Sequence, residues 1–351
     1  MSSHLAVRRS VLAFAVTLSL HAAPPPSLAA QATDRDLAAI ASWVTVDAAT
    51  GYERRIAPAL ASALGGWTAD VYGNVVTTVG TGSPHRIVAC ALDRPSYAVS
   101  QVRDDGYLRL HRIGSGSRHP LWDQQFEAQQ VRVLTTAGPV AGVVARTNGH
   151  FAQQHANETA VATADDLWLD VGAESRAEVE ALGIALLDPV GRHLPSWPIA
   201  GGVAGPDAGR RTGCAAVVAI AAAARRDGIA GRTTFVLSAQ EVTGWIGLSS
   251  LVARSERADQ VTVLAPGAGS RADSERSASE LSRFGGVLEA SGLQAVRWLV
   301  PSVEQAGSHM EVVRATEAEW LLGAAATAAG LAAVPSHGWV PAPPPAPLKS
   351  D

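Results

Sequence analysis

Apolar positions in the first third of the chain follow first a helical and then a strand-like spacing. Between residues 34 and 64 they recur every three or four positions, which predicts two amphipathic helices separated by a short loop. Residues 68–80 and 85–93 contain valine-rich apolar runs that are typical of β-strands. Gly73 and Asn74 interrupt the first of these runs and predict a tight turn between two extended pieces.

The pattern of apolar and polar residues changes in the middle of the chain. Short segments of alternating apolar and polar residues follow one another there, separated by turn signals, as in a small β-barrel or sandwich. One short helix is expected among them, because Ser175 and Glu178 have the spacing of a capping box. We therefore predict an inserted β-rich domain over residues 96–195.

Helices and strands alternate again beyond Pro198. An alanine-rich helix over residues 211–228 opens this part and a helix over residues 316–332 closes it. The elements expected between them are strands at 232–240, 258–266 and 293–301, a helix at 245–255, and a polar, mobile segment at 268–283.

Two segments with both predicted helices and predicted strands thus flank the insertion, residues 31–95 and 196–337. This pattern predicts an α/β fold with a mixed sheet and helices on both of its faces. Residues 338–351 are rich in proline and predict an extended, low-complexity tail.

The first 30 residues have the features of a secretory signal peptide. Arg8 and Arg9 precede an apolar stretch that is too short to anchor the chain in a bilayer, and small residues follow at cleavage spacing. Cleavage near Ala29 or Ala30 would change the formal net charge from −4 to −6. We expect an exported protein, periplasmic or secreted, and the sequence leaves the Sec and twin-arginine routes open.

Composition narrows the possible partners. Apolar residues make up 47% of the chain and charged residues 17%, and the negative net charge gives no basic footprint for nucleic acid. After signal cleavage no segment is expected to bind a membrane. Cys90 and Cys214 both lie in apolar runs, which favours two buried free thiols over a disulfide.

Several motifs occur in an order that resembles the M42 family of metallo-aminopeptidases, which includes the glutamyl and deblocking aminopeptidases. The most specific is "LWLDVGAESRAEVEALGI" at residues 167–184, within the insertion. The others are Thr50–Glu53, Asp70–Asn74 and Asp104–Leu108 followed by Ile113–Gly114. The resemblance implies an M42/M28-like peptidase fold and a homo-oligomer that acts on peptides.

The resemblance also implies a particular chemistry. Family members hold two divalent metals, commonly zinc or cobalt, bridged by an aspartate, and use a glutamate as general base. Two adjacent cations polarise the scissile carbonyl and lower the pKa of a shared water. Five metal ligands and one base are therefore expected.

Most of the ligand positions of the family hold other residues in this sequence. The general base corresponds to Glu241, and Asp93 corresponds to the acid that orients a histidine ligand. His309 is the remaining candidate ligand, with His337 as a less favoured alternative. The residues that stand where the resemblance predicts metal-binding side chains are Ala91, Gly209, Arg210, Val242 and Leu264 or Ala265.

Two positions that are acidic in the family carry arginine here, Arg94 and Arg210. A fixed guanidinium about 4 Å from a divalent ion would cost roughly 8 kcal/mol at an effective dielectric constant near 20. We therefore predict that Arg210, or alternatively Arg94, replaces the metals and pairs with Glu241 and Asp93.

Two functional hypotheses follow. The first is an exported, non-catalytic relative of the M42 aminopeptidases that binds peptides or acts through assembly and needs no cofactor. The alternative is an active metallo-aminopeptidase with a rebuilt or single-metal site, which would use zinc or cobalt with Glu241, His309 and Asp93.

Overall fold

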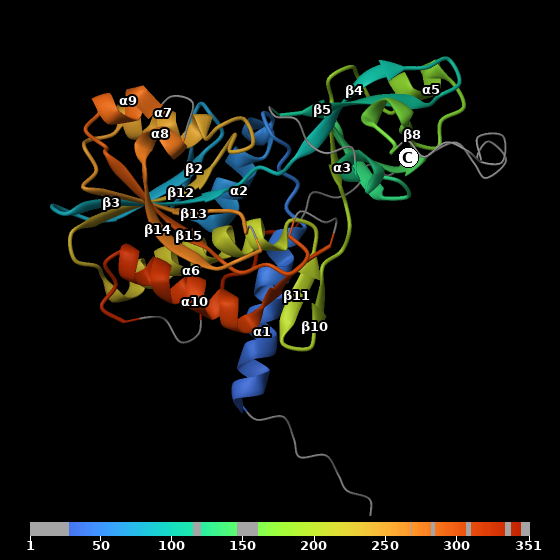
Figure 1. Cartoon of the computed structure of the whole chain (residues 1–351). Coiled ribbons are helices and arrows are strands. Elements are labelled where there is room, and N and C mark those ends of the chain that lie inside the picture. Colours follow the sequence, from blue (N-terminus) through green and yellow to red (C-terminus); the bar gives the residue numbers. More distant parts are fainter. Residues whose placement is uncertain are drawn as a thin grey trace, which may run out of the picture.

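The computed structural model describes residues 28–114, 121–145, 161–267, 269–281, 285–306, 310–333 and 338–344. The predicted signal peptide up to residue 27 and both candidate histidine ligands, His309 and His337, lie outside these residues. Figure 1 shows a large α/β part and, beside it, a smaller part built of strands.

A seven-stranded mixed sheet forms the centre of the α/β part. Its strand order is β1-β2-β12-β3-β13-β15-β14. The four strands β12, β3, β13 and β15 are parallel, and the strands outside them pair antiparallel. The bounds are β1 Thr68–Ala69, β2 Val75–Gly80, β3 His85–Ala91, β12 Arg232–Ser238, β13 Gln260–Leu264, β14 Ala272–Ser277 and β15 Ala295–Val300.

Helices cover both faces of this sheet, as the sequence predicts (Figure 1). On one face α6 and α10 pack together and α1 lies against α6. The other face carries α7, α8 and α9. The bounds are α1 Leu28–Val44, α6 Ala208–Asp227, α7 Ile246–Arg254, α8 Ala278–Leu281, α9 Gly285–Ala290 and α10 Ala315–Ala328.

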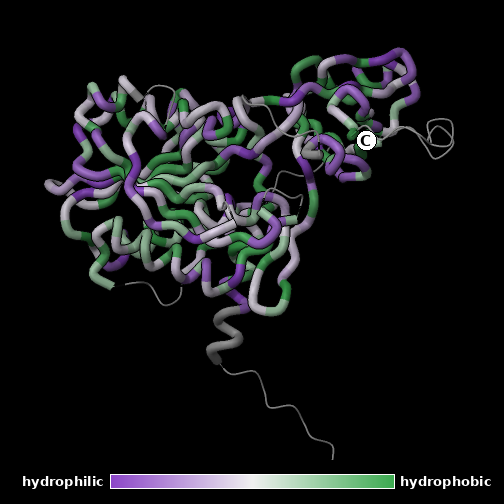
Figure 2. The backbone as a smooth tube through the Cα atoms, viewed as in Figure 1, coloured by the Kyte–Doolittle hydropathy of each residue, from purple (hydrophilic) through white to green (hydrophobic). Residues whose placement is uncertain are grey.

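The alternation of side chains along β3 explains the two layers of core. Val88 and Cys90 point into the cluster formed with α1, α6 and α10. Ile87, Ala89 and Ala91 point into the cluster formed with α7, α8 and α9. A strand that is apolar on both faces must be covered on both, which is why the apolar residues gather along the sheet in Figure 2.

The sequence prediction for residues 268–283 is wrong where the structure describes them. Residues 272–277 form the edge strand β14 and are followed directly by the one-turn helix α8. Asp273 on β14 forms an ion pair with Arg297 on β15, 2.8 Å between Oδ2 and Nη2. An edge strand needs no continuous apolar run, so its polar residues gave no strand signal.

The prediction of two free thiols is also wrong. Cys90 on β3 and Cys214 on α6 form a disulfide, with their Cα atoms 5.2 Å apart. The two cysteines are 124 residues apart in the chain. Residue pattern alone gives no signal of such a distant contact, and the apolar runs around both residues reflect only their burial.

Removal of this disulfide should destabilise the protein. We expect Cys90→Ala/Cys214→Ala to lower the free energy of unfolding by about 2 kcal/mol. Without the disulfide the unfolded chain is no longer held in a long covalent loop, and its conformational entropy rises. Urea unfolding with and without reductant would measure this. Reductant should shift the wild type toward the double variant and leave the variant unchanged, whereas a wild type insensitive to reductant would contradict the disulfide.

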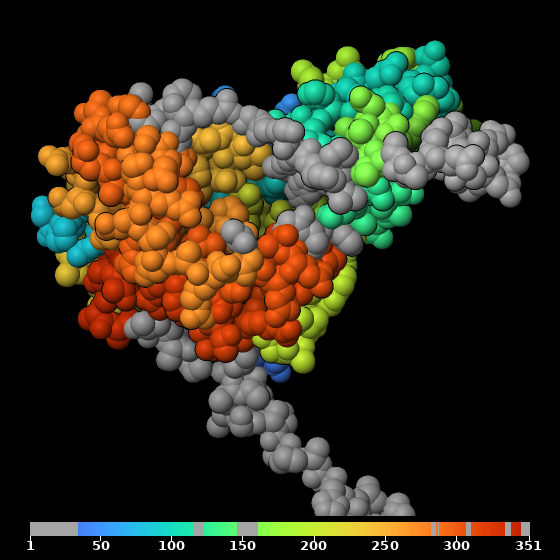
Figure 3. All heavy atoms as spheres, viewed as in Figure 1, coloured from blue at the N-terminus to red at the C-terminus, as the bar shows by residue number. Residues whose placement is uncertain are grey.

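The smaller part is a closed barrel whose strands all lie inside the range predicted for the insertion. Its strand order is β4-β5-β8-β7-β6-β9. The bounds are β4 Ser96–Val102, β5 Leu108–Ile113, β6 Gln130–Thr135, β7 Gly138–Ala145, β8 Trp168–Asp170 and β9 Pro189–Arg192. In the space-filling view the barrel projects from one side of the α/β part (Figure 3).

Short helices complete the barrel. Helix α3 spans Leu121–Gln124, η2 spans Ala164–Asp166 and α5 spans Arg176–Ala181. Ser175 caps α5 by accepting a hydrogen bond from the Glu178 amide, 3.3 Å, so the predicted N-terminus of this helix is confirmed.

The remaining elements pack against the α/β part. A three-stranded antiparallel sheet consists of β10 Trp197–Ile199, β11 Gly202–Gly205 and β16 Glu311–Arg314. The 3-10 turn η1, Glu53–Arg55, leads into helix α2, Ala57–Leu64. Among the residues described, no helix combines the length and the apolar character needed to cross a bilayer.

Candidate functional site

The loop after β12 carries the predicted general base and is held by side chains from distant segments. Four consecutive backbone amides of this loop each donate a hydrogen bond to a buried side chain. The bonds run from Ala239 to Asn74 Oδ1 (2.9 Å), from Gln240 to Glu53 Oε1 (2.8 Å), from Glu241 to Asp93 Oδ1 (2.8 Å) and from Val242 to Asp93 Oδ2 (3.1 Å). These bonds fix the backbone on both sides of Glu241.

Gln240 lies at the sharp bend of this loop. Its φ of 59° is in the left-handed region, which a non-glycine residue rarely adopts without support from its surroundings. That support comes from Glu53 and Asp93, whose side chains are fully buried and accept the amides on either side of the bend.

Asp93 lies at the end of β3, close to Glu241 as the sequence predicts. Besides the two loop amides it accepts a hydrogen bond from the Thr50 hydroxyl, 2.9 Å. Burial raises the pKa of the Asp93 carboxyl, and the neighbouring Glu241 adds to this, while Arg210 opposes it. Asp93 therefore positions the loop that carries Glu241.

Arg210 projects from the first turn of α6 and donates a hydrogen bond to Glu241, forming an ion pair. Its side chain is 9% exposed and that of Glu241 is 19% exposed. Burial works against the charged guanidinium, but Glu241, Asp93 and Asp207 together raise the pKa of Arg210 above its usual value. The predicted contact between Arg210 and Glu241 is thus present.

Arg94, the alternative partner, occupies a different place. Its Nε lies 3.7 Å from Asp207 Oδ2, and its guanidinium donates to the carbonyl oxygens of Val44 and Arg192. Arg94 follows Asp93 directly, and neighbouring residues of an extended segment point to opposite sides. Of the two predicted cations, Arg210 is the one whose guanidinium pairs with Glu241.

The side chain of the neighbouring Arg211 is buried and hydrogen-bonded to backbone carbonyl groups, away from Glu241. It is fully buried, and its guanidinium donates to the carbonyl oxygens of Leu92 and Val46. Burial and the nearby Arg94 lower the pKa of Arg211. These bonds connect the start of α6 to the segment that follows β3, next to Asp93, and to the segment that follows α1.

The geometry at Gly209 tests whether this site could take the acidic ligand expected there. A Cβ atom added at Gly209 would lie 2.6 Å from Val303 Cγ2 and 3.3 Å from the Gly267 amide nitrogen. The Gly209 amide also donates to Glu311 Oε2, 3.0 Å. The first turn of α6 is therefore packed too closely for a side chain at this position.

Among the residues that the structure describes, the side chains at the expected ligand positions do not fit a dinuclear metal centre. The side chains of Ala91, Val242 and Leu264 or Ala265 carry no ligand atoms, and Arg210 brings a cation. Within the described ranges no group of three or more His, Cys, Asp or Glu residues is arranged to hold a metal ion. No catalytic step through bound metal is derived for these residues.

Sequence reasoning missed the part played by Glu53 and Asn74. Both belong to motifs that resemble the family, "TGYE" and the turn ending in "GN", but the pattern gave no contact for either side chain. Their spacing from residue 239 exceeds 160 residues, so only the fold reveals that they accept amides of the Glu241 loop.

Comparisons with known proteins agree with this architecture. The family model of the M42 glutamyl aminopeptidases matches residues 73–281, more than half of the chain. A lysyl aminopeptidase of Pyrococcus furiosus is 29% identical over 128 residues, covering 36% of this chain and 35% of that protein. The putative aminopeptidase SgcX of Escherichia coli (strain K12) is 27% identical over 157 residues, covering 43% and 40%. The matches span well under half the length of these relatives.

Solved structures show the same fold. The TET aminopeptidase of the marine sediment archaeon Thaumarchaeota archaeon SCGC AB-539-E09 superposes with a TM-score of 0.69 at 17% identity, covering 85% of this chain and 97% of that one. The TET1 peptidase of Pyrococcus horikoshii gives 0.67 at 18% identity, covering 86% and 100%. The latter is described as assembling into a tetrahedron or a large octahedral shell.

Proposed function

This chain belongs to the M42 glutamyl aminopeptidase family, and from that premise we propose that it is a non-catalytic, exported member that binds peptides and assembles with copies of itself. The observation that carries this proposal is the ion pair between Arg210 and Glu241. The glutamate at the position of the general base accepts a hydrogen bond from a buried guanidinium, at a place where the family holds cations.

The charge of Arg210 supports the part of this proposal that concerns the metal centre, namely that none is bound. A fixed guanidinium repels a divalent cation strongly at short distance. Because Arg210 already neutralises charge near Glu241 and Asp93, the anions that remain do not need a metal to offset their repulsion. Peptide binding is proposed because the aminopeptidase scaffold is kept while the ligand set is not.

Export and assembly rest on separate observations. The proposed signal peptide and the core disulfide between Cys90 and Cys214 both suit an oxidising compartment outside the cytoplasm. Assembly is proposed by analogy with solved TET1 structures, one of which is described as a dodecamer in the asymmetric unit and another as a peptidase that can assemble into a tetrahedron or a large octahedral shell.

Metal addition should leave this protein without peptidase activity. We expect well under one zinc or cobalt per purified chain, and no turnover of aminoacyl-anilides above that of Glu241→Gln after either metal is added. Elemental analysis and a chromogenic assay measure both quantities. Turnover that depends on Glu241 and on added metal would instead support an active enzyme with a rebuilt or single-metal site.

A further inference from the structure

The barrel has a hydrophobic core of its own and is connected to the α/β part by two crossings of the chain. Among the described residues, the buried apolar side chains of the barrel core belong to neither core cluster of the α/β part. The chain enters the barrel through Arg94 and Pro95 and leaves it at His193, directly after β9. The two crossings lie side by side, because Arg94 Nη1 donates to the Arg192 carbonyl, 3.1 Å. Since each part keeps its own core, the barrel can move relative to the α/β part without exposing either core.

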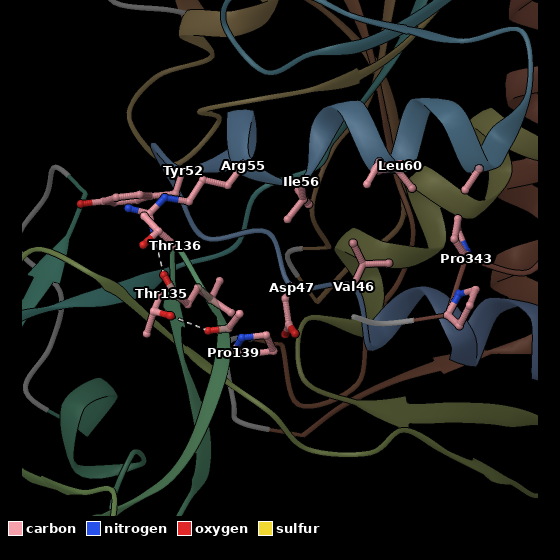
Figure 4. A pocket seen from close by; sticks show the side chains of 15 residues that line it. Val46, Asp47, Tyr52, Arg55, Ile56, Leu60, Thr135, Thr136, Pro139 and Pro343 are labelled. Atoms are coloured by element: carbon pink, nitrogen blue, oxygen red, sulfur yellow. Dashed lines mark hydrogen bonds between the residues drawn. The ribbon is translucent and has the colours of Figure 1, made fainter. Parts of the chain in front are cut away.

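Polar contacts hold the barrel against the α/β part. Arg132 on β6 forms an ion pair with Asp47, which follows α1, with 2.7 Å between Nη1 and Oδ2. Arg55 on η1 pairs with Asp188 of the barrel, 3.2 Å. Asp47 and Arg55 both line a groove of about 660 Å³ between α2 and the β6–β7 hairpin. Figure 4 shows this groove with α2 on one side and Pro139 of the hairpin on the other. The two parts therefore meet through ion pairs around an open groove, and we call this region the junction.

His193 lies on the face of the barrel that is turned toward the α/β part. Its amide donates to the Gln130 carbonyl, 2.8 Å, and so continues the antiparallel pairing of β9 with β6. Opposite residues of such a pair point to the same side, and so do residues two apart on one strand. The side chains of His193 and Arg132 are therefore diagonal neighbours on one face. Arg192 points the other way, and its guanidinium lies 5.7 Å from the centre of the Phe126 ring in the barrel core.

The charged groups that face the imidazole of His193 come from three segments. They are Arg132 on β6, Arg94 after β3 and Asp47 after α1. Burial lowers the pKa of His193, and the charges of Arg132 and Arg94 lower it further, while Asp47 opposes them. Asp47 offsets the charge of Arg132, and Asp207 offsets that of Arg94, with 3.7 Å between Oδ2 and Nε. A proton on His193 would add a positive charge to a junction whose carboxylates already have cationic partners.

We propose that protonation of His193 loosens the barrel from the α/β part, so that the groove is closed near neutral pH and widens in acid. The imidazolium repels the guanidinium of Arg132 and competes with it for Asp47, the carboxylate through which Arg132 connects the two parts. A neutral imidazole leaves that ion pair in place. The proposal goes beyond the proposed peptide binding and does not depend on it.

The direction of the pH effect follows from the difference in pKa between the closed and the open junction. In an open junction the imidazole has its ordinary pKa of 6.5, whereas the closed junction lowers the pKa of His193. The open form therefore binds the proton more readily. By linkage, the closed form is fully favoured above about pH 6.5 and loses population as the pH falls below that value.

Distances between spin labels on the two parts test this proposal in the full-length protein. Ser62→Cys on α2 and Ala137→Cys in the hairpin provide exposed positions for the labels. The native cysteines, Cys90 and Cys214, are joined in the core disulfide, so the introduced thiols take the labels. Double electron–electron resonance should give one main distance at about pH 8. At about pH 5 we expect the fraction of longer distances to rise at least about threefold.

Two substitutions of His193 should have opposite effects. His193→Gln cannot take up a proton and should keep the main distance at both pH values. His193→Lys carries a positive charge at both pH values and should give the longer distances already at about pH 8. His111→Gln is the matched control, because His111 is an exposed histidine on β5 of the barrel, and it should follow the wild type. Circular dichroism would verify that each variant is folded.

Three outcomes would overturn the proposal. The first is a wild type with the same distances at both pH values. The second is a His193→Gln variant that responds to pH as the wild type does, which would assign the effect to another group, such as Glu53 with its pKa of about 7. The third is a folded His193→Lys variant that shows only the main distance at about pH 8. The measurement involves no peptide, so its failure would leave the proposed peptide binding unaffected.

Discussion

Arg210→Ala is expected to lower the free energy of unfolding by about 4 kcal/mol at pH 7, because it removes one partner of a buried ion pair. Arg210 is 8% exposed, and its loss leaves the carboxylates of Glu241 and Asp93 close together without a cation between them. Urea unfolding followed by circular dichroism would measure the change through the midpoint at constant slope.

The double variant Arg210→Ala/Glu241→Gln separates the ion pair from packing. If the unpaired charge of Glu241 causes the loss, the double variant should recover a substantial part of the stability lost in the single one. Arg226→Ala serves as a matched control, since Arg226 lies on the same helix, is exposed, and forms an ion pair with its neighbour Asp227 at the surface. An Arg210→Ala protein with the midpoint of the wild type would refute a stabilising role for the pair.

The contact between Arg210 and Glu241 could be predicted because two local motifs fixed the register of both residues. The parallel order of β12 and β3 brings Glu241 and Asp93 to one edge of the sheet. Arg210 reaches Glu241 there from the first turn of α6. The direction of Arg94 could not be predicted in the same way, because it depends on which side of an extended segment the residue occupies.

Features that depend on contacts between residues far apart in the chain could not be predicted from the sequence. Cys90 and Cys214 are brought together by the packing of α6 on β3, and nothing in either apolar run encodes that neighbour. The edge strand β14 is polar because only its partner β15 needs burial on both sides, so its alternation was too weak to indicate a strand. The α/β class itself rests on long periodic segments and was predicted correctly.

The loop around Glu241 is fixed by hydrogen bonds from its backbone amides to buried side chains. Glu53, Asn74 and Asp93 all accept its backbone N–H groups from fully buried positions. Two of these acceptors are acids that lie close enough for Asp93 to raise the pKa of Glu53. The arrangement therefore fixes the loop but buries two neighbouring carboxyl groups. Because burial disfavours the ionised form of these groups, the free energy of unfolding should depend on pH.

Glu53→Gln is expected to stabilise the protein above pH 7 and to flatten its pH dependence. Burial first, and then the charge of Asp93, raise the pKa of Glu53 to about 7 from an ordinary value of 4.5. Because the folded pKa is the higher one, the stability contributed by Glu53 is fully present below about pH 4.5 and is lost as pH rises through 7. At 1.36 kcal/mol per pKa unit the loss is about 3 kcal/mol. Glutamine keeps the oxygen that accepts the Gln240 amide but carries no charge.

Urea unfolding at pH 5 and pH 8.5 measures this effect as a difference between two proteins. From pH 5 to pH 8.5, the wild type should lose about 2.5 kcal/mol relative to Glu53→Gln, since only the wild type must release a proton from this buried site and a small part of the loss has already occurred at pH 5. Glu180→Gln, which changes an exposed carboxylate on α5, should follow the wild type at both pH values. Parallel pH profiles for Glu53→Gln and the wild type would mean that Glu53 is already ionised in the folded protein, and that the loop amide of Gln240 is bound by a carboxylate at no cost in stability.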